Sequence, residues 1–325
     1  MSSYAVPTVE PAAARQHADQ TLAAAITKSA SLQTYYTIRF LVDRERVADA
    51  YRAYAYFRWV DDHLDAETGT RPERVAFVNR QNSLLERCYR GETPRHLTDE
   101  ETMLVTLVQG DHEQNSGLQA YIHNMMAVMS FDAERRGRLI TQDELTRYTH
   151  HLAVAVTEAM HYFIGHCCKS PKTETRYLAV KGAHIVHMLR DTFDDVAAGY
   201  FNIPREYIEA HGIQPGDVEN AAYRDWVRQR VRLARSCFQA GRNYLAQVEN
   251  LRCRLAGYAY TGRFEGVLDA IEREGYLLRS EFPERKSLGS GLRMGLAALT
   301  SLVNPRLPGM TRQTIATKQY PLKEL

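Results

Sequence analysis

The chain has 325 residues, of which 44% are apolar and 25% are charged, and its formal net charge is +2. This length and balance are typical of a globular protein with a sizeable core. Because there is no large excess of positive charge, the composition argues against a nucleic-acid-binding protein, and we expect no nucleic-acid partner.

The N-terminal stretch MSSYAVPTVEPAAARQ lacks a basic start followed by an apolar run, so it does not read as a signal peptide. The longest apolar stretch, GLRMGLAALTSLV at 291–303, contains Arg293 and is too short to span a bilayer. Five cysteines occur in no metal-ligand spacing, which favours reduced thiols. We therefore expect a cytoplasmic protein.

Apolar residues spaced three and four apart predict long helices, whereas strand alternation is almost absent. The first clear pattern covers residues 44–66. Further helical patterns cover 71–90, 116–135, 142–168, 173–199, 218–251, 263–279 and 289–303. Breakers such as GTRPE at 69–73 and GIQPGD at 212–217 separate them. The sequence predicts one all-α domain over residues 13–303, between a loose N-terminus (1–12) and a loose C-terminal tail (304–325).

Two predicted helices carry clusters of aspartate directly after aromatic or apolar residues. The clusters are Asp61, Asp62 and Asp65, and then Asp191, Asp194 and Asp195. Carboxylates four residues apart lie on one helical face and repel each other unless a cation sits between them. A solvated helix end explains one such cluster well, but it explains two less well.

Carboxylates that face each other across a pocket suit Mg²⁺, which binds a few acidic oxygens together with substrate phosphate. The metal would help a diphosphate group to leave, and the resulting carbocation would be stabilised by aromatic faces. Aromatic residues that could line such a cavity are Tyr51, Tyr54, Phe57, Tyr148, Tyr162 and Phe163. Aromatic residues at helical spacing are equally consistent with an ordinary core.

Four segments resemble the squalene/phytoene synthase family, the head-to-head prenyl synthases. They are TYYTIRFL at 34–41, RERVADAYRAYAYFRWVDDHLD at 44–65, ELTRYTHHLAVAVTEAMHYF at 144–163 and MLRDTFDDVAAGYFNIPRE at 188–206. The first resembles the family's flap, the second and fourth its two aspartate-rich motifs, and the third its central tyrosine helix. The resemblance covers residues 27–290 or so. It implies an α-helical isoprenoid synthase bundle with a central cavity.

The resemblance also implies roles for individual residues. The Mg²⁺ ligands would be Asp61, Asp65, Asp191 and Asp195, holding about two or three ions with the substrate diphosphate. Asp62 fits the first motif but would lie next to the metal ligands without binding the metal itself. Arg58 and Arg190 would clamp diphosphate, and Tyr148 would hydrogen-bond the leaving group or pass a proton.

The remaining implied contacts are to the substrate. Residues expected to bind it are Thr34, Tyr54, Phe57, His184, His187 and Arg285. Arg285 could close over phosphate, although an exposed loop explains it equally well. A substrate with a long apolar chain would also favour peripheral contact with a membrane. The sequence shows no membrane anchor and indicates no oligomeric state.

His184 and His187 stand where the family carries Gln and Asn. An Asn oxygen suits Mg²⁺, whereas an imidazole nitrogen suits softer ions. With Asp191 and Asp195 they would line one helical face, so a transition-metal site is one alternative. The others are a histidine that hydrogen-bonds diphosphate and a histidine buried in the core; we favour a role at or just behind the metal ligands.

Two other departures affect the expected product. The central helix has Ala153, Val154 and Thr157 where the family has small residues, which would narrow the cavity. The leading Ser of the flap appears as Leu32, next to Ser31.

Three functions are therefore compatible with the sequence. The first is an Mg²⁺-dependent transferase that joins two C15 or C20 prenyl diphosphates head to head. The second is a terpene cyclase, a lyase that ionises one prenyl diphosphate. The third, a family member acting only as a binding or assembly module, is disfavoured because both aspartate motifs are intact.

Overall fold

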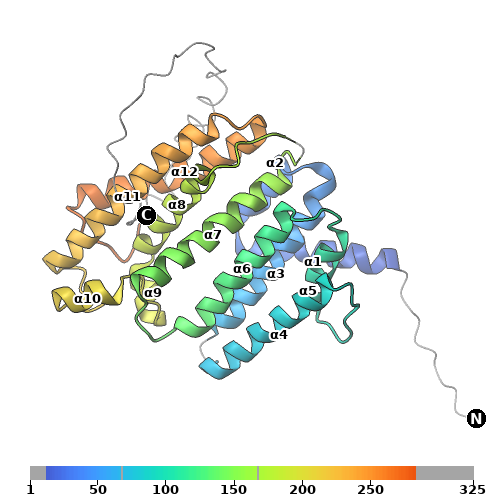
Figure 1. Ribbon diagram of the computed structural model, residues 1–325, viewed down its shortest axis with the longest axis horizontal. Helices are drawn as coiled ribbons and strands as arrows, with labels where there is room; N and C mark the ends of the chain where they lie inside the picture. The colour runs from blue at the N-terminus through green and yellow to red at the C-terminus, as the bar shows by residue number, and fades with distance from the viewer. Residues whose placement is uncertain (1–11, 67–68, 167, 283–325) are drawn as a thin grey trace, which may run out of the picture. The chain divides into compact units, whose positions relative to one another are not determined.

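The computed structural model describes residues 12–66, 69–166 and 168–282. Within these ranges the chain is helical, with no strand and a single isolated bridge between Ile140 and Pro204 (Figure 1). This confirms the all-α prediction. The helix predicted at 289–303, the tail at 304–325 and residues 1–11 of the loose N-terminus lie outside the described residues. The chain divides into two compact units, Met1–Gln119 and Ala120–Leu325.

The first unit is built around a long helix, α3, which packs against α1 and α5. Its helices are α1 (Ala12–Ala30), α2 (Leu32–Leu41), α3 (Val47–Asp65), α4 (Arg71–Tyr89) and α5 (Asp99–Gly110). Tyr56 and Val60 of α3 are fully buried. The buried Arg52 on the same helix donates from Nε to Asp19 Oδ2 of α1 at 2.5 Å. The aromatic helix that ends in the first aspartate cluster is therefore the core helix of its unit.

Threonine fixes where several of these helices begin. Thr70, Thr98 and Thr141 each precede a helix and form a capping box with the glutamate three residues later. In each box the threonine side-chain oxygen accepts from a backbone N–H that has no partner inside the helix. The glutamate carboxylate in turn accepts from the backbone N–H of the threonine. The starts of α4, α5 and α7 (Gln142–Phe163) are thus set by local sequence.

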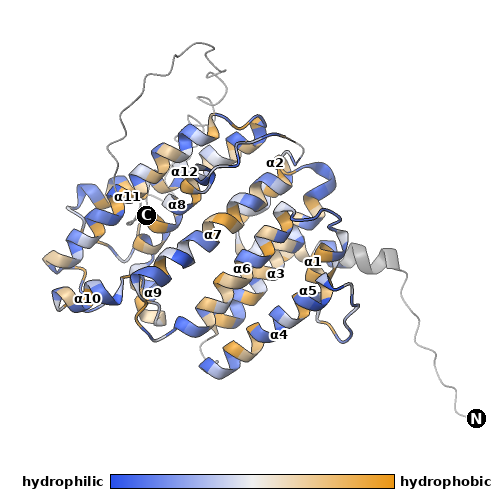
Figure 2. Cartoon of the chain, viewed as in Figure 1, coloured by the Kyte–Doolittle hydropathy of each residue, from blue (hydrophilic) through white to orange (hydrophobic). Residues whose placement is uncertain are grey.

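The second unit surrounds the buried helix α8, which packs against α7, α11 and α12. Its helices are α6 (Gly117–Arg135), α7 (Gln142–Phe163), α8 (Leu178–Arg190), α9 (Thr192–Ala198), α10 (Arg205–His211), α11 (Ala221–Leu245) and α12 (Leu251–Arg273). Figure 2 shows apolar and polar residues alternating along α11. Its apolar side chains Val227, Val231 and Phe238 enter the core. The helical spacing of its apolar residues thus determines which face of α11 packs into the core of this unit.

The helix predicted over 173–199 is broken at the second aspartate cluster. α8 ends at Arg190, Asp191 caps it, and α9 begins at Thr192. The Asp195 N–H still bonds the Asp191 carbonyl at 2.8 Å, so the helical i to i+4 relation of these two residues survives the break. α9 then ends at Gly199, whose φ of 85° is in the left-handed region that favours glycine.

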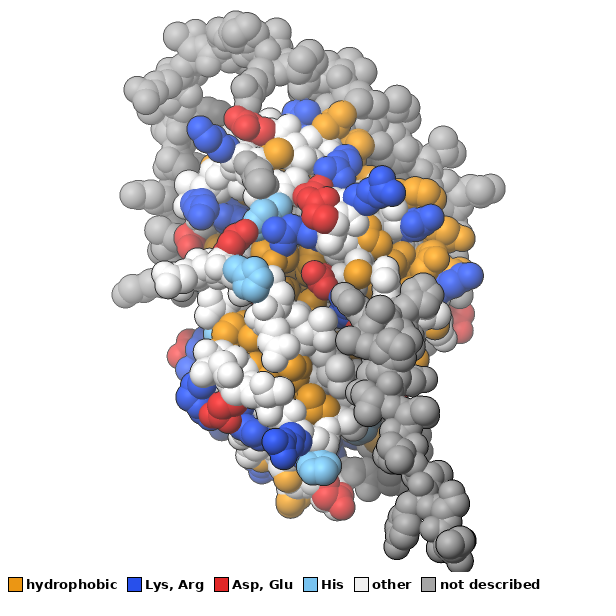
Figure 3. All heavy atoms as spheres, turned by 90° about the vertical axis from the view of Figure 1, so that its right-hand side faces the viewer, with side chains coloured by type: hydrophobic (Ala, Val, Ile, Leu, Met, Phe, Trp, Pro, Cys, Tyr) orange, Lys and Arg blue, Asp and Glu red, His pale blue; other side chains and the backbone are white. Residues whose placement is uncertain are grey.

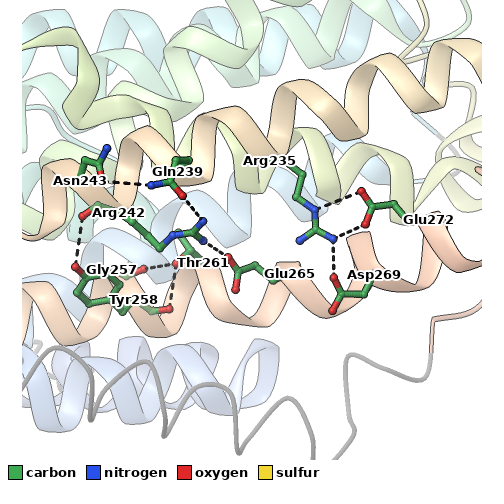
Figure 4. Close-up of polar contacts among 10 residues, drawn as sticks. All are labelled: Arg235, Gln239, Arg242, Asn243, Gly257, Tyr258, Thr261, Glu265, Asp269 and Glu272. Carbon is green, nitrogen blue, oxygen red and sulfur yellow. Dashed lines mark hydrogen bonds and ion pairs between the residues drawn. The ribbon is translucent and has the colours of Figure 1, made fainter. Parts of the chain in front are cut away.

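Ion pairs join the outer faces of α11 and α12 (Figure 4). Arg235 on α11 bonds Asp269 at 2.6 Å and Glu272 at 2.7 Å, both on α12. Arg242, two turns further on, pairs with Glu265. These exposed pairs fix the register of the two helices more than they stabilise them.

Two helical glycines are expected to respond in opposite directions to alanine. A Cβ at Gly241 of α11 would lie 2.7 Å from the Ala179 backbone of α8, so Gly241→Ala should destabilise the protein by about 1–3 kcal/mol. A Cβ at Gly262 of α12 meets nothing within 4 Å, so Gly262→Ala should stabilise it by about 0.5–1 kcal/mol. Urea denaturation measures both changes. Equal effects of the two substitutions would contradict the close approach of α8 and α11.

Charges of both signs are mixed with apolar and histidine side chains on the face shown in Figure 3. This mixture agrees with the small net charge of +2. Among the described residues, no helix combines the length and the apolar character needed to cross a bilayer.

Candidate active site

The first aspartate cluster lies at the C-terminal end of α3, where an arginine of the same helix binds it. Arg58 Nη1 donates to Asp61 Oδ2 at 3.3 Å, and Nη2 contacts Asp62 Oδ1. All three side chains are about half exposed. Asp65, one turn beyond Asp61, is exposed. The carboxylates at this helix end therefore remain accessible, and a guanidinium that could bind phosphate already lies among them.

Helix α2 brings further polar groups to α3. The side chain of Ser31 caps α2 and accepts from the Thr34 hydroxyl at 2.9 Å. The Tyr54 hydroxyl of α3 hydrogen-bonds Thr34 and Ser31; burial raises the pKa of Tyr54, and these bonds oppose the rise. Thr34 and Tyr54 are thus brought together, one turn before Arg58. Phe57 on α3 is buried against Tyr56.

This arrangement also explains a departure noted in the sequence. By direct count Leu32 replaces the leading Ser of the flap, but Leu32 is exposed. Ser31 supplies the hydroxyl that meets Thr34 and Tyr54.

The second aspartate cluster lies at the junction of α8 and α9. Both oxygens of Asp191 are held by the guanidinium fork of Arg190. His187 Nε2 lies 2.7 Å from Asp191 Oδ2. Burial pushes the pKa of Asp191 up, but the bonds to Arg190 and His187 outweigh it and leave the pKa below its ordinary value. Asp191 is therefore ionised and charge-compensated at neutral pH.

Asp195 is different because little positive charge reaches it. Its Oδ2 accepts from Asn202 Nδ2 at 2.7 Å. Burial, followed by repulsion from Asp191, raises the pKa of Asp195 to about 7, and Arg135 only partly opposes this. The two carboxylates predicted to share a metal thus repel each other across one helical turn.

Tyr148 of α7 takes part in a buried network with the end of α6. Its hydroxyl donates to Asp132 Oδ2 at 3.0 Å, and Arg135 Nε donates to Asp132 Oδ1 at 2.6 Å. Arg135 also donates to Asn202 Oδ1 at 2.8 Å, which extends the network to Asp195. Burial, and then the nearby Asp132, hold the pKa of Tyr148 well above its ordinary value. The hydroxyl therefore remains protonated and can act as a hydrogen-bond donor.

The sequence favoured a solvated helix end for FDAERRGR at 131–138, although the family resemblance places an acidic–basic pair nearby, and it gave Asp132 and Arg135 no role. In the structure Arg135 is buried, with its guanidinium carbon 4.6 Å from the centre of the Tyr148 ring. A usable signal was present, because Val128, Asp132 and Arg135 follow an i, i+4, i+7 spacing. Val128 is buried, so these two charged residues continue a buried face of α6.

His184 lies deeper in α8, beside Tyr148. The two ring centroids are 5.3 Å apart. Burial, followed by the charge of neighbouring His187, holds the pKa of His184 well below its ordinary value. Neither ring nitrogen has a hydrogen-bond partner among the described residues. A neutral ring of this kind can donate one bond and accept one, but it supplies no positive charge to a diphosphate.

The donor set fits Mg²⁺ better than a softer ion. Among the described residues, no group of three or more His, Cys, Asp or Glu side chains is arranged to hold a metal. Mg²⁺ does not need such a cage, because it binds through one or two carboxylates with substrate phosphate and water. His187 is engaged with Asp191 and His184 is buried, so nothing favours a nitrogen-ligated site.

The predicted residues therefore fall into two groups. Thr34, Tyr54, Arg58 and the first cluster belong to one unit, whereas Tyr148, His184, His187, Arg190 and the second cluster belong to the other. The convergence of the two clusters stays a prediction. Arg285 lies outside the described residues.

Comparison with known proteins relates this chain to squalene and phytoene synthases. The family model for squalene/phytoene synthase matches residues 27–289. The crystal structure of squalene synthase HpnC from Alicyclobacillus acidocaldarius is similar at a TM-score of 0.63 and 19% identity, covering 82% of this chain and 97% of that one. A dehydrosqualene synthase in complex with ligand is similar at a TM-score of 0.66 and 14% identity, covering 89% and 97%. At these identities the two likenesses concern the fold alone. No curated protein matches the sequence.

Proposed function

Because this chain belongs to the squalene/phytoene synthase family, we propose that it is an Mg²⁺-dependent transferase. It would condense two prenyl diphosphates, of C15 or C20 length, head to head with loss of diphosphate. The observation that carries this proposal is the repeated pairing of arginine with motif aspartate, Arg58 with Asp61 and Arg190 with Asp191. A carboxylate and a guanidinium side by side are the two groups that a metal-bound diphosphate requires.

The four aspartates would hold the metal. Asp61 and Asp65 would contribute from α3, and Asp191 and Asp195 from the junction of α8 and α9. When bound, Mg²⁺ would neutralise the diphosphate and make it a better leaving group. Burial, and then repulsion from Asp191, raise the pKa of Asp195, and a bound cation would remove that repulsion.

The arginines would bind the diphosphate oxygens directly. A guanidinium presents a planar fork of donors that matches phosphate. Arg190 and Nη1 of Arg58 are paired with carboxylates that would turn to metal, so these donors would become available to phosphate as the metal binds. Nη2 of Arg58 contacts Asp62, which is not a proposed ligand. Thr34 and Tyr54 would add hydroxyl contacts on the α2 side.

Tyr148 would act as a fixed donor. Its raised pKa keeps the proton on the hydroxyl, and Asp132 and Arg135 hold the side chain in position. Its single O–H proton, which Asp132 accepts in the structure, would turn to an oxygen of the departing diphosphate, and the hydroxyl would stay neutral. His184, neutral and next to it, would offer a polar contact without attracting the anion.

A terpene cyclase is the second candidate. The observations that favour it are the histidines in place of Gln and Asn, and the bulkier Val154 and Thr157 in the central helix. A narrower chamber would admit one prenyl chain more easily than two. A binding module without catalysis is less well supported, because the arginine–aspartate pairs and the Tyr148 network are all present.

Product analysis distinguishes these functions. The purified chain, incubated with Mg²⁺ and C10, C15 or C20 diphosphates, should release diphosphate and form a product with twice the carbon number of its substrate, detected by mass spectrometry. EDTA should abolish the reaction. A product with the carbon number of one substrate would identify a cyclase and refute coupling. No diphosphate release from any of the three substrates would leave only the binding module.

A further inference from the structure

Helix α2 exposes a row of large apolar side chains. Leu32, Tyr36 and Phe40 are 57%, 50% and 70% exposed. Residues four apart in an α-helix drift by only about 40°, so the three lie on one face. The rings of Tyr36 and Phe40 stack with their centroids 6.0 Å apart. We call this face, Leu32, Tyr36 and Phe40, the α2 stripe. A contiguous exposed apolar row commonly marks an interaction surface.

The opposite face of α2 is already occupied. Thr34 bonds Ser31 there, and both reach Tyr54 of α3. Ile38, one turn later on that side, is buried. Tyr35 stacks on Tyr51 of α3 at 5.4 Å. These contacts fix the rotation of α2, so the stripe is not a core face turned outward by chance.

The charged residues nearest to the stripe along the chain are basic. Between residues 20 and 42 the only charged residues are Lys28 and Arg39, and both are exposed. The segment after α2, at 43–46, carries two acids and two arginines, of which Arg44 and Glu45 are exposed. The stripe therefore has cations beside it and no carboxylate within α2 itself.

These features suit a lipid surface better than a second copy of the chain. Three such side chains, about half exposed, offer on the order of 300 Å², whereas a stable dimer needs roughly 800 Å² from each partner. Two copies facing each other would also bring Lys28 and Arg39 of each near those of the other. Leucine and aromatic side chains with basic residues beside them are typical of helices that lie in a membrane interface.

We propose that α2 docks the protein on an anionic lipid bilayer. Leu32, Tyr36 and Phe40 enter the boundary between headgroups and acyl chains, and Lys28 and Arg39 attract the headgroups. The contact does not depend on the proposed reaction. If that reaction holds, it places Thr34 and Tyr54, on the inner side of α2, next to a source of apolar substrate.

Vesicle sedimentation tests the proposal with the full chain. The wild type should sediment with phosphatidylcholine vesicles that contain about 30% phosphatidylglycerol, and much less with phosphatidylcholine alone. The double variant Tyr36→Ser/Phe40→Ser should bind at least about fivefold less. A matched control is Tyr89→Ser/Leu251→Ser, which removes apolar side chains that are 36% and 38% exposed elsewhere. The control should bind like the wild type. Arg39→Gln should weaken binding to the anionic vesicles only.

The outcomes are separable. Equal sedimentation of the wild type and the stripe variant, or no sedimentation of the wild type, overturns the proposal. A concentration-dependent dimer that the stripe variant abolishes, seen by light scattering without vesicle binding, identifies a second copy as the occupant and also overturns it. Circular dichroism confirms that the stripe variant is folded. None of these measurements uses enzyme activity, so failure here leaves the proposed function untouched.

Discussion

Asp61→Asn and Asp191→Asn are each expected to reduce product formation by at least about 100-fold. Asp61→Asn should change stability little, whereas Asp191→Asn should also lower it, because it removes the charge that Arg190 and His187 bind. Each substitution removes one negative charge from a cluster that is proposed to hold metal with diphosphate. Each also keeps the size of the side chain, and the half exposure of Asp61 leaves folding nearly unaffected. The measurement is product formation at saturating Mg²⁺, with thermal denaturation as the folding check.

Neighbouring aspartates provide the controls. Asp62→Asn and Asp194→Asn alter exposed carboxylates one and three residues away. Their effects should stay within about tenfold, because neither is proposed to touch metal. Full activity in Asp61→Asn or Asp191→Asn would refute the metal role. Equal losses in all four variants would show that general negative charge matters, and not particular ligands.

Arg135→Met is expected to destabilise the protein by about 3–5 kcal/mol, the largest stability effect that we predict. Arg135 is buried and binds Asp132 and Asn202. Removing the guanidinium takes away the Nε hydrogen bond and the positive charge next to the Asp132 carboxylate, which is mostly buried. The Tyr148 hydroxyl would then be the remaining donor of this network to that carboxylate. Urea denaturation followed by circular dichroism measures the change.

The adjacent Arg136 is the matched control. It donates to the Ala198 carbonyl at 2.9 Å from a more exposed position. Arg136→Met should therefore cost about 1 kcal/mol or less. Adding Asp132→Asn to Arg135→Met should recover part of the lost stability, because it removes the carboxylate charge that Arg135 neutralises in the wild type. A loss near 1 kcal/mol for Arg135→Met would contradict the buried network.

Local sequence determined most of the helical structure. Regular apolar spacing predicted α3, α4 and α6 to within a few residues, because burying a helix requires that spacing. It did not predict α1, α2, α5 or α10, and it placed the start of α12 at 263 instead of at Leu251. The apolar spacing also predicted α8 and α9 as one helix, because it continues across Asp191, whereas the backbone leaves the helical conformation there.

For the site, the sequence by itself determined that aspartates four apart follow buried helices and that an arginine stands beside each cluster. Charge and helical periodicity are properties of neighbouring residues, so they can be read along the chain. Neighbours along the chain compensate Asp61 and Asp191. Only the tertiary structure decided the surroundings of Asp195. Asn202 and Arg135 are 67 residues apart, and their meeting depends on how α6, α7 and the segment after α9 pack. Burial then decides the chemistry of Asp195, because it removes the water that would otherwise screen its charge and so raises its pKa, whereas Arg190 and His187 keep Asp191 ionised despite burial.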